Sequence, residues 1–277
     1  MTQTNTNCKI IVITSGKGGV GKTTTTANIG AGLAMKGYKV ALIDTDTGLR
    51  NLDLLLGLEN RIMYDLVDVT SGKIPYKKAL VRHKKYETLF LLPTSQTKDK
   101  LAVSPEQVVA LCSEMSADFD FILIDCPAGI EQGFKTAVAA ADIALVVTMP
   151  EISAVRDADK IIGELNRADK ENILLIVNRI RPDMVAKGEM LDLDDINDIL
   201  AIKCIGQIPD DEMVVSSTNR GEPVIANTKS QAGIAYQNIT RRLCGEDVPF
   251  MTFRTKESFF DRLKKLVESQ IKENNDS

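Results

Sequence analysis

Short apolar runs recur along the chain, and each is followed by a mostly polar stretch. They cover residues 9–14, 39–44, 88–93, 121–125, 143–149, 173–178 and 202–209. Most of these runs are continuously apolar instead of alternating, as is typical of strands that are covered on both faces of a sheet. The pattern therefore predicts a set of mostly buried strands.

Helix-like periodicity fills the intervals between these runs. It covers residues 22–36, 104–117, 152–168, 192–200 and 229–243. Ser104, Pro105 and Glu106 have the order of an N-cap, a first helical position and a first-turn acid. Gly37 suits the end of the first helix. Strands that alternate with helices predict an α/β fold, with a mostly parallel twisted sheet and helices on both faces.

The chain is long enough to bury one sizeable core, since it has 277 residues of which 44% are hydrophobic. Its composition changes only after about residue 248. We therefore predict one domain over residues 1–247 and a linker over 248–255. An amphipathic helix over 256–272 and a polar tail over 273–277 would follow.

Charge and cysteine content exclude several classes of protein. A net charge of −4 and a pI near 5.3 argue against a protein whose whole surface binds nucleic acid, and leave a local basic patch as the alternative. Five scattered cysteines without a CxxC pair, together with one histidine, disfavour a zinc or iron–sulfur site within one protomer. No apolar run has the length of a membrane span, and Met1–Asn7 lacks the apolar core of a signal peptide. We expect a cytoplasmic protein with reduced thiols.

One segment matches the phosphate-binding pattern G-x-x-x-x-G-K-T. It consists of Gly16, Lys17, Gly18, Gly19, Val20, Gly21, Lys22 and Thr23, with Thr24 next in the chain. The segment follows a predicted strand and opens a predicted helix, as the motif requires. Its backbone N–H groups would surround phosphate oxygens at a helix N-terminus. Lys22 would neutralise the β- and γ-phosphates, and the Thr23 hydroxyl would bind Mg²⁺.

Acidic residues follow two of the predicted strands. Asp44 and Asp46 come at the end of the second apolar run, and Asp125 ends the run Phe-Ile-Leu-Ile-Asp. Ligands of open α/β sheets bind beyond the carboxyl ends of the strands, so these acids can meet the phosphate loop. Asp125 has the position of a Walker B acid, which holds Mg²⁺ through water. Simple caps after strands are the alternative interpretation.

A second lysine inside the loop is not needed for phosphate binding alone. Residues 17–23, Lys-Gly-Gly-Val-Gly-Lys-Thr, carry the deviant Walker A signature. The chain in this respect resembles the family of ParA-like and MinD-like ATPases. The resemblance implies ATP and Mg²⁺ as cofactors. It also implies that Lys17 reaches the partner's ATP across a nucleotide-bound homodimer.

Longer strings place the resemblance among the MinD-like, division-site ATPases. They lie at residues 14–24, 43–61, 92–100, 125–131, 150–160 and 221–225. This resemblance implies that Lys17, Lys22 and Asp46 are catalytic, with Asp46 positioning the attacking water. It implies that Asp44 lies near the magnesium and that Asn178 contacts the adenine edge. The segment after Asp125 would be a nucleotide-sensing switch.

A helix over residues 256–272 would gather apolar side chains on one arc. The arc consists of Phe259, Phe260, Leu263, Leu266, Val267 and Ile271, flanked by Arg262 and Lys264. With five basic and three acidic residues, the segment has a net charge of +2 in an acidic protein. This is the pattern of a helix that lies on an anionic membrane surface. A helix docked on its own domain, or on a coiled-coil partner, is the alternative.

These features together predict an ATPase that cycles on and off the inner face of the cell membrane and positions the division septum. The resemblance implies a division-inhibitor partner of the MinC kind and an activator of the MinE kind. Residues 150–160 are a candidate contact surface, or else a solvated helix face. A flagellar-number ATPase and a DNA-partitioning ATPase of the same family are the alternatives. The acidic charge and the amphipathic tail disfavour the second of these.

Overall fold

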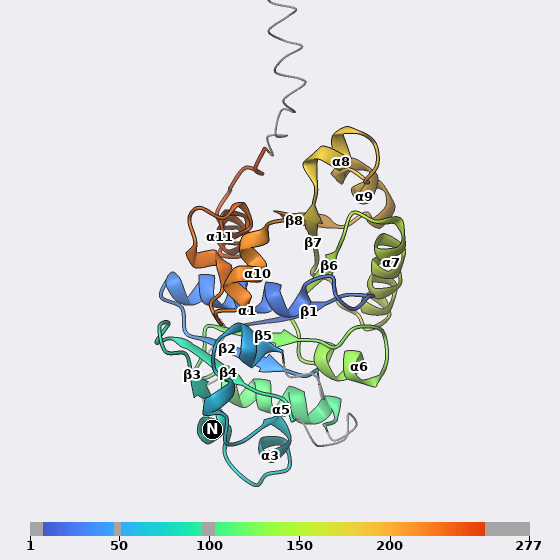
Figure 1. The fold of residues 1–277 in the computed structure, drawn as a ribbon. Coiled ribbons are helices and arrows are strands. Elements are labelled where there is room, and N and C mark those ends of the chain that lie inside the picture. Colours follow the sequence, from blue (N-terminus) through green and yellow to red (C-terminus); the bar gives the residue numbers. More distant parts are fainter. Residues whose placement is uncertain (1–7, 47–50, 96–102, 253–277) are drawn as a thin grey trace, which may run out of the picture.

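A computed structural model describes residues 8–46, 51–95 and 103–252. Its centre is an eight-stranded sheet with the order β3-β4-β2-β5-β1-β6-β7-β8 (Figure 1). The strands are β1 (Lys9–Thr14), β2 (Val40–Asp44), β3 (Val81–Arg82), β4 (Leu89–Leu92), β5 (Phe121–Asp125), β6 (Ile143–Thr148), β7 (Ile173–Ile180) and β8 (Lys203–Pro209). All neighbouring strands are parallel except β3 and β4, which are antiparallel.

Helices cover both faces of this sheet. One face is covered by α1 (Lys22–Met35), α2 (Leu52–Leu55), the 3₁₀ turn η2 (Val224–Ala226) and α11 (Gln231–Leu243). The other is covered by α3 (Leu66–Thr70), α4 (Tyr76–Ala79), α5 (Pro105–Met115), α6 (Gln132–Val138), α7 (Ile152–Arg167) and α9 (Leu193–Leu200). The remaining short elements are η1 (Glu59–Arg61), α8 (Pro182–Ala186) and α10 (Glu212–Thr218).

Strand β1 shows how the sheet separates two apolar layers. Ile11 and Ile13 pack into the layer with α1 and α11, whereas Val12 packs into the layer with α5, α6 and α7. All three side chains are fully buried. Successive side chains of a strand point to opposite faces, so a strand buried on both faces must be apolar throughout. This explains the continuous apolar runs of the sequence.

Local capping explains where α5 begins. The Ser104 hydroxyl accepts a hydrogen bond from the Gln107 N–H, and the Gln107 side chain accepts one from the Ser104 N–H. Pro105 occupies the first helical turn, where its missing N–H costs nothing. This reciprocal capping box confirms the N-cap that was predicted at Ser104.

The predicted α/β class is confirmed, and each predicted strand lies within one or two residues of its expected bounds. The helix expected from residue 229 begins at Gln231, because the Ser230 hydroxyl caps it. The short elements α2, α3, α4, α6, α8, α10 and β3 were not predicted. They are too short to produce a visible periodicity.

The proposed C-terminal elements fall at the edge of the described chain. The predicted linker, residues 248–255, is described as far as Thr252. The predicted helix 256–272 and the polar tail 273–277 lie outside the described residues, and so do their candidate membrane residues. Within the described ranges, no helix combines the length and the apolar character that crossing a bilayer requires.

Candidate nucleotide-binding site

The phosphate loop connects β1 to α1 and contains two left-handed glycines. Gly19 has φ +80° and Gly21 has φ +102°, a region that residues with a Cβ rarely adopt. The carbonyl of Gly21 accepts the first helical hydrogen bond, from the N–H of Thr25 at 2.9 Å. A Cβ on Gly16 would lie 2.2 Å from the Asp157 carbonyl oxygen of α7, so this position has no room for a side chain. The open N-terminus of α1 thus faces the loop, as anion binding requires.

Lys22 is held beneath the loop. Its side chain is buried, and Nζ donates to the Ser15 hydroxyl at 3.0 Å. The Ser15 hydroxyl in turn donates to the Lys17 carbonyl at 2.8 Å. A buried ammonium needs partners that compensate for lost hydration, and a phosphate would supply them. The sequence did not single out Ser15, since a serine before the loop is no part of the motif.

Two carboxylates meet at the carboxyl ends of adjacent strands. Asp44 ends β2 and Asp125 ends β5, and the two residues are register partners. Both are almost completely buried. Thr26 Oγ1 donates to Asp125 Oδ1 at 3.1 Å, and the Thr23 hydroxyl also hydrogen-bonds Asp125. The predicted convergence of these acids with the phosphate loop is therefore present.

Burial and mutual repulsion make this acid pair hard to ionise. Burial raises the pKa of Asp125 to about 6, although the Thr23 hydrogen bond and the charge of Lys22 act in the opposite direction. Burial, and then the charge of Asp125, also raise the pKa of Asp44 well above its ordinary value. A divalent cation nearby would favour the ionised forms.

This donor set fits Mg²⁺ that shares its ligands with a nucleotide. Mg²⁺ is typically held by one or two carboxylates, a hydroxyl, waters and substrate phosphates. Thr23, Asp44 and Asp125 provide such groups beside the phosphate loop. Across residues 8–46, 51–95 and 103–252, no group of three or more His, Cys, Asp or Glu side chains could hold a metal ion. A cation at this site would therefore need the nucleotide phosphates and waters as further ligands.

Asp46 lies two residues beyond the end of β2. Its N–H donates to Asp44 Oδ1 at 2.9 Å, and its side chain is half-buried. The residues after Asp46, 47–50, lie outside the described chain. The geometry places Asp46 next to the acid pair, and its role towards the attacking water stays a prediction.

Lys17 differs from Lys22 in its exposure. Its side chain remains 44% exposed, and Nζ lies 3.9 Å from a Glu151 carboxylate oxygen and 3.5 Å from the Ser153 hydroxyl. Exposed ion pairs of this kind contribute little to stability. Lys17 is therefore free to exchange Glu151 for another anion.

Asn178, near the end of β7, supports the phosphate loop directly. Its side chain is buried, and Nδ2 donates to the Val20 carbonyl at 2.8 Å. A Cβ on Gly21 would lie only 2.3 Å from this nitrogen, so the loop and the amide are closely packed. The contact with adenine that the sequence suggested stays a prediction.

Further polar residues of α1 tie the site to the C-terminal elements, and the sequence did not reveal them. The hydroxyls of Thr25 and Tyr236 lie 3.3 Å apart in the core. Asn28 Oδ1 accepts from the Ile225 N–H at 2.8 Å, and its Nδ2 donates to the Thr24 carbonyl. The four consecutive threonines after Lys22 are an unusual composition for a buried helix. They were the one feature of the sequence that could have indicated polar contacts inside the core.

The comparisons with known proteins agree with this geometry. A family model described as the CobQ/CobB/MinD/ParA nucleotide binding domain matches residues 11–224. The septum site-determining protein MinD of Synechocystis is 55% identical over 246 residues, which are 88% of this chain and 92% of that protein. The chain belongs to the MinD family.

Solved structures of MinD proteins have the same fold. The MinC:MinD complex of Aquifex aeolicus matches with a TM-score of 0.84 and 50% identity, over 89% of this chain and all of that one. MinD of Pyrococcus horikoshii, which was solved with Mg-ADP, matches with a TM-score of 0.76 and 29% identity, over 85% of this chain and 96% of that one. MinD-family membership confirms the resemblance and the predicted class, a septum-site P-loop ATPase.

Proposed function

We propose that this chain is an ATP-dependent, dimerising ATPase that cycles on and off an anionic membrane surface at the cell's inner face. The observation that carries this proposal is the contrast between its two loop lysines. Lys22 is buried under the loop, whereas Lys17 is exposed and loosely paired. One lysine serves the protomer's own phosphates, and the other is available to a second copy.

Each residue of the site has a defined task in this proposal. The loop N–H groups and Lys22 bind the β- and γ-phosphates, while Thr23, Asp44 and Asp125 hold the cation. Mg²⁺ supplies charge neutralisation at the phosphates when it is bound. Asp46 orients the attacking water, and Lys17 contacts the phosphates of the partner protomer.

Dimerisation explains why the nucleotide would control membrane binding. A single amphipathic helix buries limited apolar area, so one protomer binds lipid weakly. A dimer carries two such helices, and the second binds at a high effective concentration. Hydrolysis removes the γ-phosphate contacts between protomers, which separates them and releases both helices.

The partner proposal rests on α7. The Aquifex relative was solved as a complex of MinC with MinD. In this chain Ile152 at the start of α7 is 63% exposed, beside Glu151 and Ser153 that contact Lys17. We propose that this surface receives a division inhibitor of the MinC kind and an activator of the MinE kind that stimulates hydrolysis. Both would then sense the nucleotide through Lys17.

Light scattering tests the dimer part of the proposal. With ATP–Mg²⁺, we expect the mass of the unaltered protein to double relative to ADP–Mg²⁺, and Lys17→Ala to remain monomeric in both. Lys36→Ala is the control, because Lys36 also forms a surface ion pair, with Glu246 at 2.7 Å, but lies at the other end of α1. An ATP-dependent dimer of Lys17→Ala would contradict the role proposed for Lys17.

A further inference from the structure

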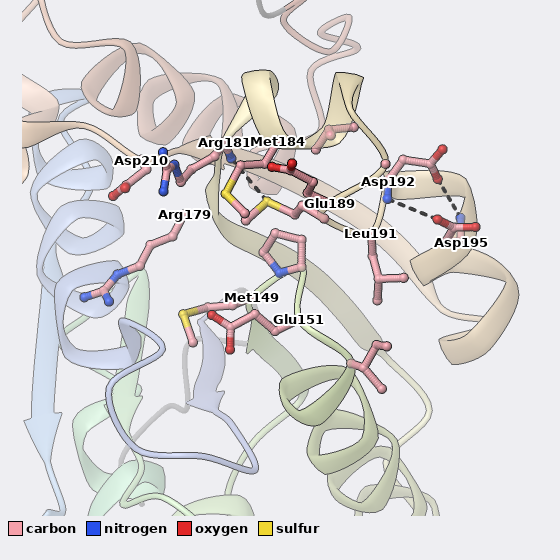
Figure 2. Close-up of a pocket in the computed structure, with 15 residues that line it drawn as sticks. Met149, Glu151, Arg179, Arg181, Met184, Glu189, Leu191, Asp192, Asp195 and Asp210 are labelled. Carbon is pink, nitrogen blue, oxygen red and sulfur yellow. Dashed lines mark hydrogen bonds between the residues drawn. The ribbon is translucent and has the colours of Figure 1, made fainter.

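Two cavities adjoin each other beside α8, and the larger of them is drawn in Figure 2. The smaller one is lined by residues that reach the end of the described chain. Its volume is about 480 Å³, within the range of about 300–1,000 Å³ that is usual for binding pockets. Its lining is mostly apolar and includes Val177, Ile180, Val185, Ile196, Phe250 and Met251. These side chains come from β7, α8, α9 and the end of the described chain. The cavity is therefore an apolar binding site at the end of the described chain, where the C-terminal segment begins.

We propose that the apolar arc of residues 256–272 docks in this cavity in the ADP state, away from the membrane. The inference rests on the proposed function, since it says where the membrane helix lies before it meets lipid. Thr252 itself lines the cavity, and Phe259 follows seven residues later. Seven residues span at most about 25 Å, which is enough to turn back into an adjacent cavity. Chain continuity thus favours this segment over any other occupant.

Charge favours the same occupant. Helix α9 and its N-cap carry four acidic side chains, namely Asp192, Asp194, Asp195 and Asp198, all of them exposed. Asp192 lines the cavity. Residues 256–272 carry a net charge of +2, with Arg262 and Lys264 flanking the apolar arc. Basic side chains beside an apolar arc therefore match an apolar cavity that Asp192 lines and that lies beside the acidic surface of α9, as they also match an anionic bilayer.

Because residues 256–272 are covalently joined to the residues that line the cavity, even weak docking is effective. A short covalent connection gives an effective concentration on the order of millimolar, so a contact with a dissociation constant below that value is mostly occupied. Docking of this strength holds the helix back in the monomer. Two helices released together on one dimer bind lipid more tightly than either binds its cavity.

The cavity also adjoins the larger cavity, which reaches a residue that contacts the phosphate loop. It shares Pro150, Val185, Leu191 and Asp192 with the cavity of about 730 Å³ in Figure 2. That larger cavity extends to Glu151, the partner of Lys17. Glu151 follows Pro150, one of the shared residues, so the exchange of Lys17 from Glu151 to the phosphates of a second protomer changes the charge beside the wall that the two cavities share. Release of the helix is thereby linked to dimer formation.

The chain contains no tryptophan, so a single one reports its own surroundings. In full-length Phe259→Trp with ADP–Mg²⁺ and no lipid, we expect blue-shifted emission and slow quenching by acrylamide. Adding Ala186→Phe, which fills the cavity from an exposed position, should shift the emission to that of a solvated indole. Asp194→Lys, on the exposed face of α9, should act in the same direction. Ala117→Phe, an exposed alanine at the end of α5, is the matched control and should change nothing.

The outcomes separate this inference from the proposed function. Solvent-like emission with ADP would overturn docking, and buried emission that neither Ala186→Phe nor Asp194→Lys alters would place the helix elsewhere and also overturn it. Anionic vesicles with ATP–Mg²⁺ provide the second arm. A blue shift there leaves the membrane function standing even if docking fails. If the tryptophan shows solvent-like emission with ADP and also no blue shift with vesicles and ATP–Mg²⁺, the membrane function is contradicted as well.

Discussion

Two neighbouring regions at the carboxyl edge of the sheet differ in how strongly their side chains are held in place. Where β1, β2 and β5 end, Lys22, Asp44 and Asp125 are buried. Each is held by a hydrogen bond to a neighbouring residue, Lys22 to Ser15, Asp44 to the Asp46 N–H and Asp125 to Thr26. Where β7 ends, α8 and α9 surround two open cavities, and the charged residues Arg181 and Asp195 remain exposed. The first region is preorganised for one ligand, as catalysis requires. The second region has exposed side chains and open cavities, so different segments or ligands can bind there in turn.

The largest expected effect is that of Lys22→Ala in the preorganised region. Removing a buried cation from the phosphates should lower kcat on the order of 100- to 1,000-fold, as for other groups that stabilise developing charge. Steady-state ATPase assays and nucleotide titrations would measure it. Lys36→Ala, at the other end of α1, should retain full activity. Comparable activity in both variants would remove Lys22 from the site.

Asp44→Asn should weaken Mg²⁺ binding and stabilise the ligand-free protein. Groups that surround a bound metal typically change its affinity about 10- to 100-fold, so the Mg²⁺ concentration for half-maximal activity should rise by that factor. The assay is ATPase activity against Mg²⁺ concentration. Unchanged Mg²⁺ dependence would exclude Asp44 from the cation site.

The raised pKa of Asp44 also determines how the folding stability changes with pH. Because burial and Asp125 raise the pKa of folded Asp44, the folded state keeps its proton at pH values where the unfolded chain has lost it. This contribution to stability is present at low pH and is lost as pH rises above the ordinary aspartate pKa of about 3.9. Ligand-free Asp44→Asn should therefore melt higher than the unaltered protein at pH 7.5, and the difference should vanish near pH 4. Equal melting temperatures at both pH values would contradict the raised pKa.

The same two regions show what the sequence could predict. The phosphate loop and Asp125 were predictable because a motif of adjacent residues sets its own backbone geometry between a strand and a helix. Thr26 was not, because its partner Asp125 becomes a neighbour only through packing, and Ser15 was not, because it precedes the motif. The cavities beside α8 and α9 depend on how two short helices pack against β7, which no local pattern indicates.

Asn178→Asp should have an intermediate effect. The substitution keeps the shape but removes the N–H that donates to the Val20 carbonyl. Leaving a buried acceptor without its donor costs about 1–3 kcal/mol of unfolding free energy, and a buried carboxylate that faces the same carbonyl adds to this cost. Urea denaturation with and without ADP–Mg²⁺ would measure this cost and the accompanying loss of nucleotide affinity. An unchanged midpoint would show that the loop does not depend on Asn178.

The smallest effect is expected at the adaptable region. Arg181 is 51% exposed and pairs with Asp183 at 3.6 Å, so Arg181→Ala should change the unfolding free energy by less than about 0.5 kcal/mol. Nucleotide affinity should stay the same. Isothermal titration with ADP–Mg²⁺ checks this directly. A tenfold loss of affinity would show that the cavity of Figure 2 belongs to the nucleotide site and would break the comparison.

Co-sedimentation with anionic vesicles tests nucleotide-controlled membrane binding most directly. The unaltered protein and Leu263→Glu, which places a charge in the apolar arc, would be compared in ATP–Mg²⁺ and in ADP–Mg²⁺. We expect the unaltered protein to pellet with ATP only, and Leu263→Glu to stay in the supernatant in both states. Equal pelleting with ATP and ADP, or pelleting that Leu263→Glu does not reduce, would contradict a membrane helix under nucleotide control.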